Sequence, residues 1–308
     1  MTTEGSYAAF AADAPSAHDD VGTSPFEWGG GNAPRILGPL SEVGSGLKIA
    51  TWNVNSVRKR TGNLVSWLER AKPDVVVLQE IKAQEAQFPA LEVEAAGYKV
   101  AIVGQKGFNG VALLSLHPFD VTARALPGNG EDEQARYVEG RIQTPHGPLT
   151  VGGIYLPNGN PIGTEKFSYK LAWMQRLFEH AQSLLARGEM FVLGGDYNVC
   201  PTDIDVFSPA AFAGDALCQP ESRAALRKLI NLGLTDALRA FHPDDVLYTF
   251  WDYQAGAWQK DNGLRIDHLL LSPQAADRLT AVGIDKVERG KTEPSDHVPV
   301  WCELNVAA

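Results

Sequence analysis

Apolar runs that lead into polar residues recur along the chain and predict a domain rich in β-strands. Residues 47–52, 74–80 and 189–193 form nearly continuous apolar runs, a pattern typical of strands buried on both faces. These runs end at or lead into an amide or a carboxylate. Further strands are predicted at residues 97–103, 110–116, 121–125, 137–143, 149–155, 264–271 and 298–304.

Three segments between these strands have the period of amphipathic helices. In residues 57–68 the apolar side chains fall on one helical face, and Pro73 ends the segment. A long apolar stripe over residues 167–185 is followed by Gly188, a common helix stop, and another helix is predicted at 221–232. The long stripe predicts a helix that packs on the core.

The first 46 residues have a different composition from the rest of the chain. They are rich in Gly, Ala, Ser, Pro and Asp and show no sustained period of 2 or 3.6. Such a segment buries too little apolar surface to fold, so we predict a disordered extension at 1–46. The remaining residues, 47–308, are long enough for one large domain.

Charge and cysteine content narrow the functional classes. The formal charge is −10, and without the extension's six acids and one base the body still holds 26 bases against 31 acids, a net charge of −5. A protein body with this negative net charge is expected to bind nucleic acid only if a local basic groove or bound divalent cations overcome the repulsion of the phosphates. The three cysteines are scattered and lack the spacing of a metal site. The sequence has no apolar run long enough to span a membrane and no signal-peptide pattern, so we predict a cytoplasmic protein that binds no membrane.

Chemistry-capable side chains gather at the predicted strand ends. Carboxylates and amides without a cysteine ligand suit a hard cation such as Mg²⁺ or Mn²⁺, which leaves positions open for phosphate oxygens. Phosphoester hydrolysis matches this set, because a metal neutralises charge on the phosphate and an acid or imidazole manages the proton of the attacking water. The set consists of Asn53, Glu80, Tyr155, Asp196, Asn198, Asp267, Asp296 and His297.

The stretch Gly194-Gly195-Asp196-Tyr197-Asn198 follows an apolar strand. We expect its two glycines to let the backbone turn sharply and approach a ligand, and its Asp and Asn to point the same way. An Asx-type turn after the strand is the alternative reading of this stretch. The dense aromatic cluster at 248–253 is likewise open between a core corner and a stacking surface for bases and sugars.

Six motifs in register resemble the exonuclease III family of DNA-repair nucleases, within the endonuclease/exonuclease/phosphatase superfamily. Together they run from about residue 47 to residue 304. The motifs are Trp52-Asn53-Val54-Asn55-Ser56, Leu78-Gln79-Glu80, Gly104-Gln105-Lys106-Gly107, Gly194-Gly195-Asp196-Tyr197-Asn198, Leu264-Arg265-Ile266-Asp267 and Ser295-Asp296-His297-Val298-Pro299-Val300. The resemblance implies an α/β fold of the α+β type, a four-layer αββα sandwich of two mixed β-sheets flanked by helices.

The resemblance also implies a divalent metal site at one edge of this sandwich. Glu80 would be the principal ligand of Mg²⁺, with Mn²⁺ as a substitute, and Asn53 would lie beside it. Asp296 would share the cation. The candidate ligands are completed by Asp196, Asn198 and His297.

Catalytic roles follow from the same resemblance. Asp196 would orient or deprotonate the attacking water or protonate the leaving group, and Asn198 would hold the scissile phosphate. Tyr155 would stabilise charge on the phosphate. His297 would act as base or electrophile, oriented by Asp267 or Asp296.

The implied reaction is cleavage of duplex DNA 5′ to an abasic site, together with 3′-to-5′ exonuclease activity and removal of blocking groups from 3′ ends, by a monomer. Phe250 stands where many relatives have Trp, which bears on the balance of the two nuclease activities. A small-phosphoester or lipid-headgroup phosphatase and a catalytically inactive DNA-binding module are the alternatives. The candidate DNA contacts are Lys106, Arg136, Asn158, Phe250, Trp251 and Arg265, and Lys166 and Lys170 are further candidates for a basic groove.

Overall fold

The computed structural model describes residues 46–306. The extension predicted to be disordered lies outside the described residues, apart from Gly46, which begins the first strand. In the described part no helix has the length and apolar character needed to cross a membrane.

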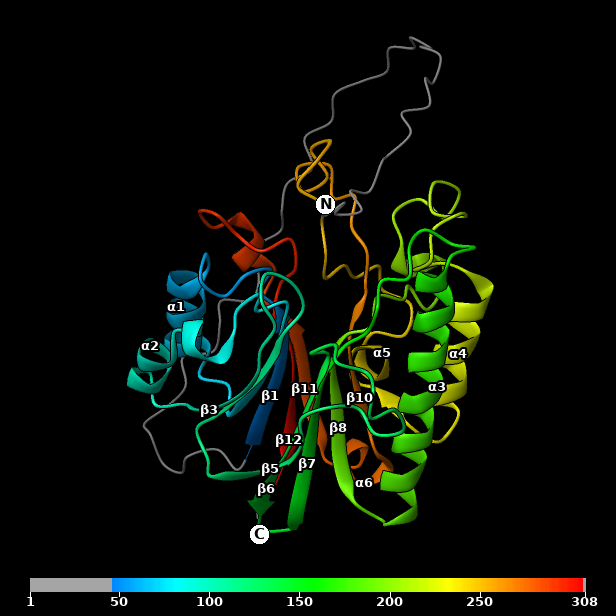
Figure 1. The fold of residues 1–308 in the computed structure, drawn as a ribbon. Coiled ribbons are helices and arrows are strands. Elements are labelled where there is room, and N and C mark those ends of the chain that lie inside the picture. The colour runs from blue at the N-terminus through cyan, green and yellow to red at the C-terminus, as the bar shows by residue number, and fades with distance from the viewer. Residues whose placement is uncertain (1–45, 307–308) are drawn as a thin grey trace, which may run out of the picture.

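Two six-stranded mixed sheets form the centre of the domain (Figure 1). Parallel pairing joins β1 to β2 in the first sheet and β7 to β8 in the second, and the other neighbours are antiparallel. The first sheet has the order β11 (Leu279–Ile284), β12 (Val300–Asn305), β1 (Gly46–Asn53), β2 (Val75–Gln79), β4 (Val111–Ser115), β3 (Lys99–Val103). The second has the order β5 (Phe119–Ala123), β6 (Tyr137–Thr144), β7 (Gly147–Tyr155), β8 (Met190–Asp196), β10 (Asp267–Leu271), β9 (Thr235–Asp236).

Helices cover the outer faces of both sheets. In Figure 1, α1 and α2 lie on one side of the pair of sheets and α3 and α4 lie on the other. The helices are α1 (Thr61–Ala71), α2 (Ala90–Ala95), α3 (Glu165–Ala186), α4 (Pro220–Ile230), α5 (Ala237–Phe241) and α6 (Pro273–Ala276), and short 3₁₀ turns occur at Glu85–Gln87, Asp203–Asp205 and Lys286–Gly290. The four-layer αββα sandwich of two mixed sheets is therefore confirmed.

The two sheets pack closely because glycines replace side chains where the strands approach. An added Cβ at Gly153 of β7 would lie 3.0 Å from the Val77 side chain of β2 in the facing sheet, and one at Gly194 of β8 would lie 3.4 Å from the same side chain. Within the second sheet, an atom added at Gly195 would lie 2.0 Å from the carbonyl oxygen of Ile154 on the neighbouring strand. The glycine pair before Asp196 is thus part of β8 and serves packing, and the expectation of a sharp glycine turn there is wrong.

Other differences from the sequence prediction are local. The strand predicted at 264–271 begins at Asp267, because Leu264 pairs instead with Val206 and Phe250 in isolated bridges. The periodicity did not reveal β11, a partly exposed edge strand, nor the short elements α2, α5, α6 and β9. All three cysteines lie in the described part and are free thiols.

Both ends of the described chain lie at the same edge of the first sheet. Gly46 pairs with Asn305 at the start of β1 and the end of β12. The opposite edge, where β1 ends and β12 begins, carries the polar residues described next.

Candidate active site

The sheet topology brings the predicted polar strand ends to one edge. Parallel strands β1 and β2, and likewise β7 and β8, present their carboxyl ends together. Strands β10 and β12 run antiparallel to β8 and β1, so their beginnings reach the same edge, and the first residue of β10, Asp267, pairs directly with Asp196. Side chains from six strands therefore meet around one cleft.

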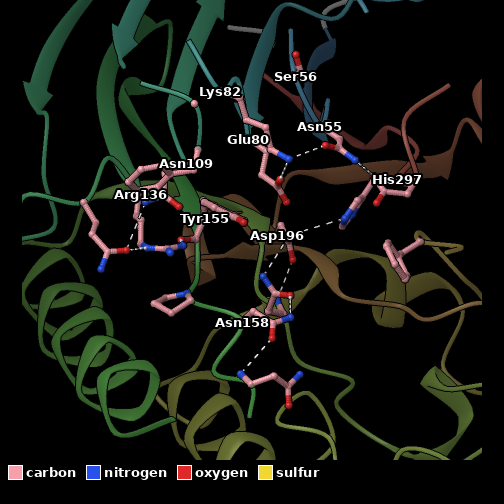
Figure 2. A pocket seen from close by; sticks show the side chains of 18 of the residues that line it. Asn55, Ser56, Glu80, Lys82, Asn109, Arg136, Tyr155, Asn158, Asp196 and His297 are labelled. Atoms are coloured by element: carbon pink, nitrogen blue, oxygen red, sulfur yellow. Dashed lines mark hydrogen bonds and ion pairs between the residues drawn. The ribbon is translucent and has the colours of Figure 1, made fainter. Parts of the chain in front are cut away.

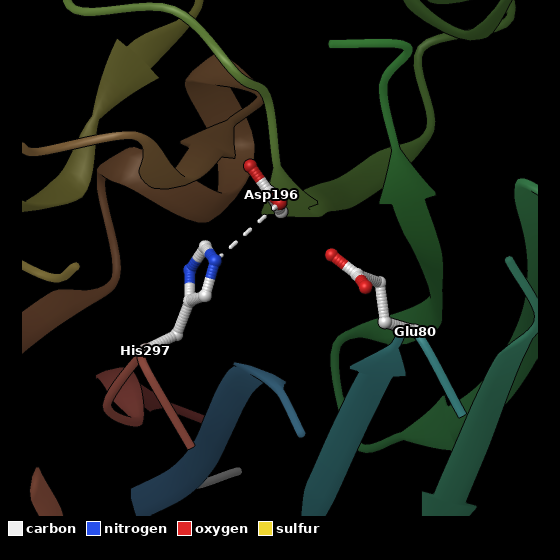
Figure 3. A group of neighbouring side chains, drawn as sticks. All are labelled: Glu80, Asp196 and His297. Atoms are coloured by element: carbon white, nitrogen blue, oxygen red, sulfur yellow. Dashed lines mark ion pairs between the residues drawn. The ribbon is translucent and has the colours of Figure 1, made fainter. Parts of the chain in front are cut away.

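Within the described residues, one group of three His or acidic side chains lies close enough to hold a metal ion. Glu80, Asp196 and His297 each offer one ligand atom, and these atoms lie within 4.8 Å of one another (Figure 3). Oxygen and imidazole ligands in such a group suit a small divalent cation. The residues present therefore fit the hard metal predicted from the sequence.

The Asn53 side chain holds the two carboxylates of this group together. Its amide nitrogen donates to Glu80 Oε1 at 2.9 Å and to Asp196 Oδ2 at 3.0 Å. Glu80 follows β2 with a left-handed φ of 48°, a conformation that non-glycine residues adopt rarely and often at functional sites. Asn53 thus bridges the ends of β1, β2 and β8.

Lys82 compensates the charge of Glu80. Its ammonium group lies 3.0 Å from Glu80 Oε2 and donates to Asn55 Oδ1 at 2.8 Å. Burial alone would raise the pKa of Glu80, but Lys82, the Asn53 amide and His297 outweigh burial and hold that pKa below its ordinary value. Glu80 is therefore kept as a carboxylate.

Asp196 and His297 form a buried acid and imidazole pair. His297 Nε2 lies 3.9 Å from Asp196 Oδ2, and Nδ1 lies 2.9 Å from Asp267 Oδ2. Asp267 also accepts a 2.6 Å hydrogen bond from the Thr249 hydroxyl, which fixes the carboxylate behind the ring. Of the two carboxylates expected to orient the imidazole, Asp267 is the one that contacts it.

Burial and the neighbouring charges shift the pKa values of both Asp196 and His297. Burial raises the pKa of Asp196 to about 7, and the Asp267 and Glu80 carboxylates add to this rise although His297 acts against it. Burial lowers the pKa of His297, but Asp267 and Asp196 dominate and raise it to about 10. A carboxyl group that titrates near neutrality in a cleft is suited to proton transfer.

A second layer of amides lies below Asp196. The Asn198 side-chain amide donates to the Leu156 carbonyl at 2.9 Å, and Asn158 donates to Asn198 Oδ1 at 3.2 Å. The backbone N–H of Asn198 donates to Asp196 Oδ1 at 2.9 Å while its φ is 48°. Lys170, from α3, donates to the carbonyl oxygens of both Asn158 and Asn198.

Tyr155 and Asp296 complete the residues expected at the site. Tyr155 ends β7 beneath the guanidinium of Arg136, which lies 4.7 Å from the ring centroid, and burial with the nearby Glu80 raises its pKa well above the ordinary value. Asp296 Oδ1 accepts from the Asn55 amide at 3.1 Å, and burial raises the Asp296 pKa. Both side chains border the cleft, with Asp296 turned toward Asn55.

Several cationic side chains line the cleft, and Figure 2 labels two of them, Lys82 and Arg136. The volume of the cleft is about 960 Å³, enough for several nucleotide units or a small phosphoester. Sequence reasoning missed most of the cations that line it: Arg58, Lys59 and Arg60 fall within the predicted helical segment 57–68, and Lys82 lies two residues after the strand predicted at 74–80. The cationic lining residues are Arg58, Lys59, Arg60, Lys82, Arg136 and Lys166.

Several predicted DNA contacts lie elsewhere. Trp251 and Lys170 have no exposed surface, and Arg265 is 1% exposed, so Trp251 and Arg265 are not placed to contact DNA and Lys170 does not line a basic groove. Arg265 instead pairs with Asp205 and Asp236. Lys106 is exposed but does not line the cleft.

The aromatic cluster at 248–253 divides between the two readings that the sequence left open. Trp251 is a core residue packed edge-on against Trp258 at a centroid distance of 5.0 Å. Phe250 lines the cleft and packs on His297 at 4.9 Å, and Tyr253 is half exposed beside it. Asn158 also lines the cleft, as expected.

Comparison with known proteins agrees with this geometry. Residues 50–297 match the model of the endonuclease/exonuclease/phosphatase family. The chain is 34% identical to exodeoxyribonuclease III of Haemophilus influenzae over 84% of this chain and 100% of that protein.

Solved structures extend the similarity to the fold. An AP endonuclease from Archaeoglobus fulgidus shares 37% identity over 84% of this chain and 100% of its own, with a TM-score of 0.80. A 3′ phosphatase from Neisseria, bound to a product DNA hairpin, shares 36% identity over 84% and 99%, also with a TM-score of 0.80. The chain therefore belongs to the endonuclease/exonuclease/phosphatase family, and it is a phosphodiester hydrolase of the exonuclease III type, as the six motifs indicated.

Proposed function

We propose that this protein is a divalent-metal-dependent DNA-repair nuclease that cleaves duplex DNA 5′ to abasic sites and removes nucleotides and blocking groups from 3′ ends. The observation that carries the proposal is the group of Glu80, Asp196 and His297 at the base of a cleft with a basic rim. The relatives support it, since similar proteins are named as an exodeoxyribonuclease, an AP endonuclease and a 3′ phosphatase.

Glu80 would hold the cation, with Asn53, Asp196 and Asp296 beside it. When bound, Mg²⁺ or Mn²⁺ would neutralise charge on the scissile phosphate. His297, kept protonated by Asp267, would face the phosphate as a cation and hydrogen-bond donor rather than as a ligand.

Asp196 would manage the proton of the attacking water or of the leaving oxygen, because its pKa of about 7 lets it gain or lose a proton at neutral pH. The Asn198 and Asn158 amides lie beside it and would bind phosphate oxygens. Tyr155 would donate a hydrogen bond to developing charge, since its raised pKa keeps it a neutral phenol.

The local field of the cleft supports a polyanionic substrate despite the acidic body. Arg58, Lys59, Arg136 and Lys166 line the rim on which the phosphate backbone would lie. Phe250 beside His297 would contact the exposed sugar. We further propose that the protein acts on DNA as a monomer in the cytoplasm.

The test is incision of a labelled duplex with one abasic analogue, in Mg²⁺ and in EDTA, beside Glu80→Ala and Asp196→Asn. We expect incision at the 5′ side that is lost with chelator and in both variants. Two further substrates are assayed in parallel: a duplex that ends in a 3′ phosphate, and a free nucleotide monophosphate. The first measures removal of blocking groups from 3′ ends, and the second measures the activity of a small-phosphoester phosphatase. Cleavage of the monophosphate alone, or DNA binding without cleavage, would overturn the proposal.

A further inference from the structure

Lys170 is a buried cation that reaches the floor of the cleft from the helical layer. It lies on the first turns of α3, its side chain has no exposed surface, and the aliphatic part passes below Gly159. Its ammonium group donates to the backbone carbonyl of Asn198 at 2.6 Å and to that of Asn158 at 3.0 Å. A buried lysine without solvent contact cannot bind DNA directly, so its two hydrogen bonds serve another purpose.

The two backbone carbonyl groups belong to Asn158 and Asn198, the two residues whose side-chain amides lie at the site. Asn158 lies on the segment after β7 and Asn198 on the segment after β8, and the side chain of one donates to the other at 3.2 Å. Asn198 has a left-handed φ of 48°, a conformation that asparagine adopts more readily than most residues. Lys170 joins both segments through one ammonium group.

Close packing shows that the lysine position is built for this contact. An added Cβ at Gly159 would lie 2.6 Å from Lys170 Cδ, so the glycine lets the lysine stem pass. Gly159 has a φ of 89°, which only glycine adopts readily. The chain thus keeps a glycine next to Asn158 where the lysine crosses.

We propose that Lys170 is a positioning residue for phosphodiester cleavage, which sets the separation of the Asn158 and Asn198 amides and so aims both at the scissile phosphate. The role rests on the proposed function of the site. A displacement of about 1 Å at such a site costs on the order of 10²-fold in rate.

The first test compares Lys170→Met with a control on the same helix, His180→Leu. His180 lies ten residues further along α3, about 15 Å from Lys170 along the helix axis, and bonds to Glu139 at 2.7 Å outside the cleft. Lys170→Met loses two buried hydrogen bonds from α3, and His180→Leu loses one contact from the same helix. We expect kcat on the abasic duplex to fall about 10- to 100-fold in Lys170→Met at an unchanged KM, while His180→Leu keeps kcat within about twofold.

The second test is a mutant cycle with the pair Asn158→Ala and Asn198→Ala. If Lys170 acts through these two amides, adding Lys170→Met to the pair makes the enzyme no slower within about threefold. A purely structural lysine would instead give effects that multiply, or a loss of thermal stability with an unchanged kcat per folded molecule. Either result would overturn the positioning role.

Amide hydrogen exchange separates this proposal from the proposed function. If the wild-type protein fails to cut DNA, the proposed function fails, but exchange at residues 156–160 and 196–200 still tests the lysine. We expect faster exchange there in Lys170→Met than in His180→Leu. Equal exchange in the two variants would refute the positioning role even in an active enzyme.

Discussion

Two clusters of buried charged side chains lie near the same edge of the fold, and they differ in how their charges are paired. In the arginine cluster, defined as Arg239, Arg265, Asp205 and Asp236, every carboxylate faces a guanidinium: Arg265 lies 2.5 Å from Asp205 and 2.7 Å from Asp236. In the catalytic group, Glu80, Asp196 and Asp267 converge on His297 as their shared partner, with Lys82 at the side.

The pKa values show what the difference achieves. Although burial acts in the opposite direction, Arg265 lowers the pKa of Asp205 to about 2, so that carboxylate stays ionised at any ordinary pH. Burial and neighbouring carboxylates raise the pKa of Asp196 to about 7. The paired charges of the arginine cluster hold the fold together. In the catalytic group the carboxylates outnumber their cationic partners, so binding a cation or a proton there lowers the free energy of the site.

The largest expected effect is on stability, and it comes from the arginine cluster. Arg265→Met leaves the Asp205 and Asp236 carboxylates buried with fewer partners, and we expect the free energy of unfolding to fall by about 3–5 kcal/mol. Urea unfolding measures the change. Activity per folded molecule should be retained, because Arg265 does not line the cleft; a selective loss of activity would break the distinction between the two groups.

The catalytic group should respond in the reverse way. Asp196→Asn removes the proposed proton-transfer group and one of the converging carboxylates, so we expect cleavage to slow by about 10²- to 10⁴-fold. Stability should be unchanged or higher, because repulsion from Asp267 and Glu80 is relieved. Single-turnover rates and thermal unfolding of the same preparation test both parts, and a destabilised Asp196→Asn would show that this carboxylate holds the fold.

Metal addition should stabilise the protein through the catalytic group alone. At about 100 times its dissociation constant, a bound cation adds about 2.7 kcal/mol to the free energy of unfolding. We expect Mg²⁺ or Mn²⁺ to raise the melting temperature of the wild type and of Arg265→Lys, but not of Glu80→Gln. A metal shift that survives in Glu80→Gln would place the cation elsewhere.

The smallest effect is a pH dependence of stability that belongs to Asp205. Its pKa is depressed in the folded state, so its contribution is complete above the unfolded pKa of about 4 and is lost as pH falls toward the folded pKa of about 2. The contribution is about 2–3 kcal/mol. Unfolding of the wild type and Asp205→Asn at pH 7 and pH 3 measures it, and the two proteins should differ less at pH 3; a constant difference would contradict the assignment.

The sequence predicted much of the fold because apolar runs and the polar residues that end them are local signals. Glu80 and Asp196 are recognisable since each follows a buried run, and the sheet topology then brings them together. The roles of Arg265 and Lys170 were misjudged for a physical reason: a basic residue looks the same in sequence whether it faces solvent or a buried partner. The partners of Arg265 lie 60 and 29 residues away, beyond any local pattern.

The pairing of Gly46 with Asn305 has a practical consequence for handling the protein. Both ends of the described chain enter the fold at the edge opposite the cleft, and the eight residues of β1 span roughly 25 Å between the two edges. A surface tether, fluorophore or fused domain attached after Asn305 would leave the approach of a long DNA duplex unobstructed. The same proximity makes a linker between the two ends short, so new termini opened in a distant surface loop offer a route to a circularly permuted enzyme with its cleft intact.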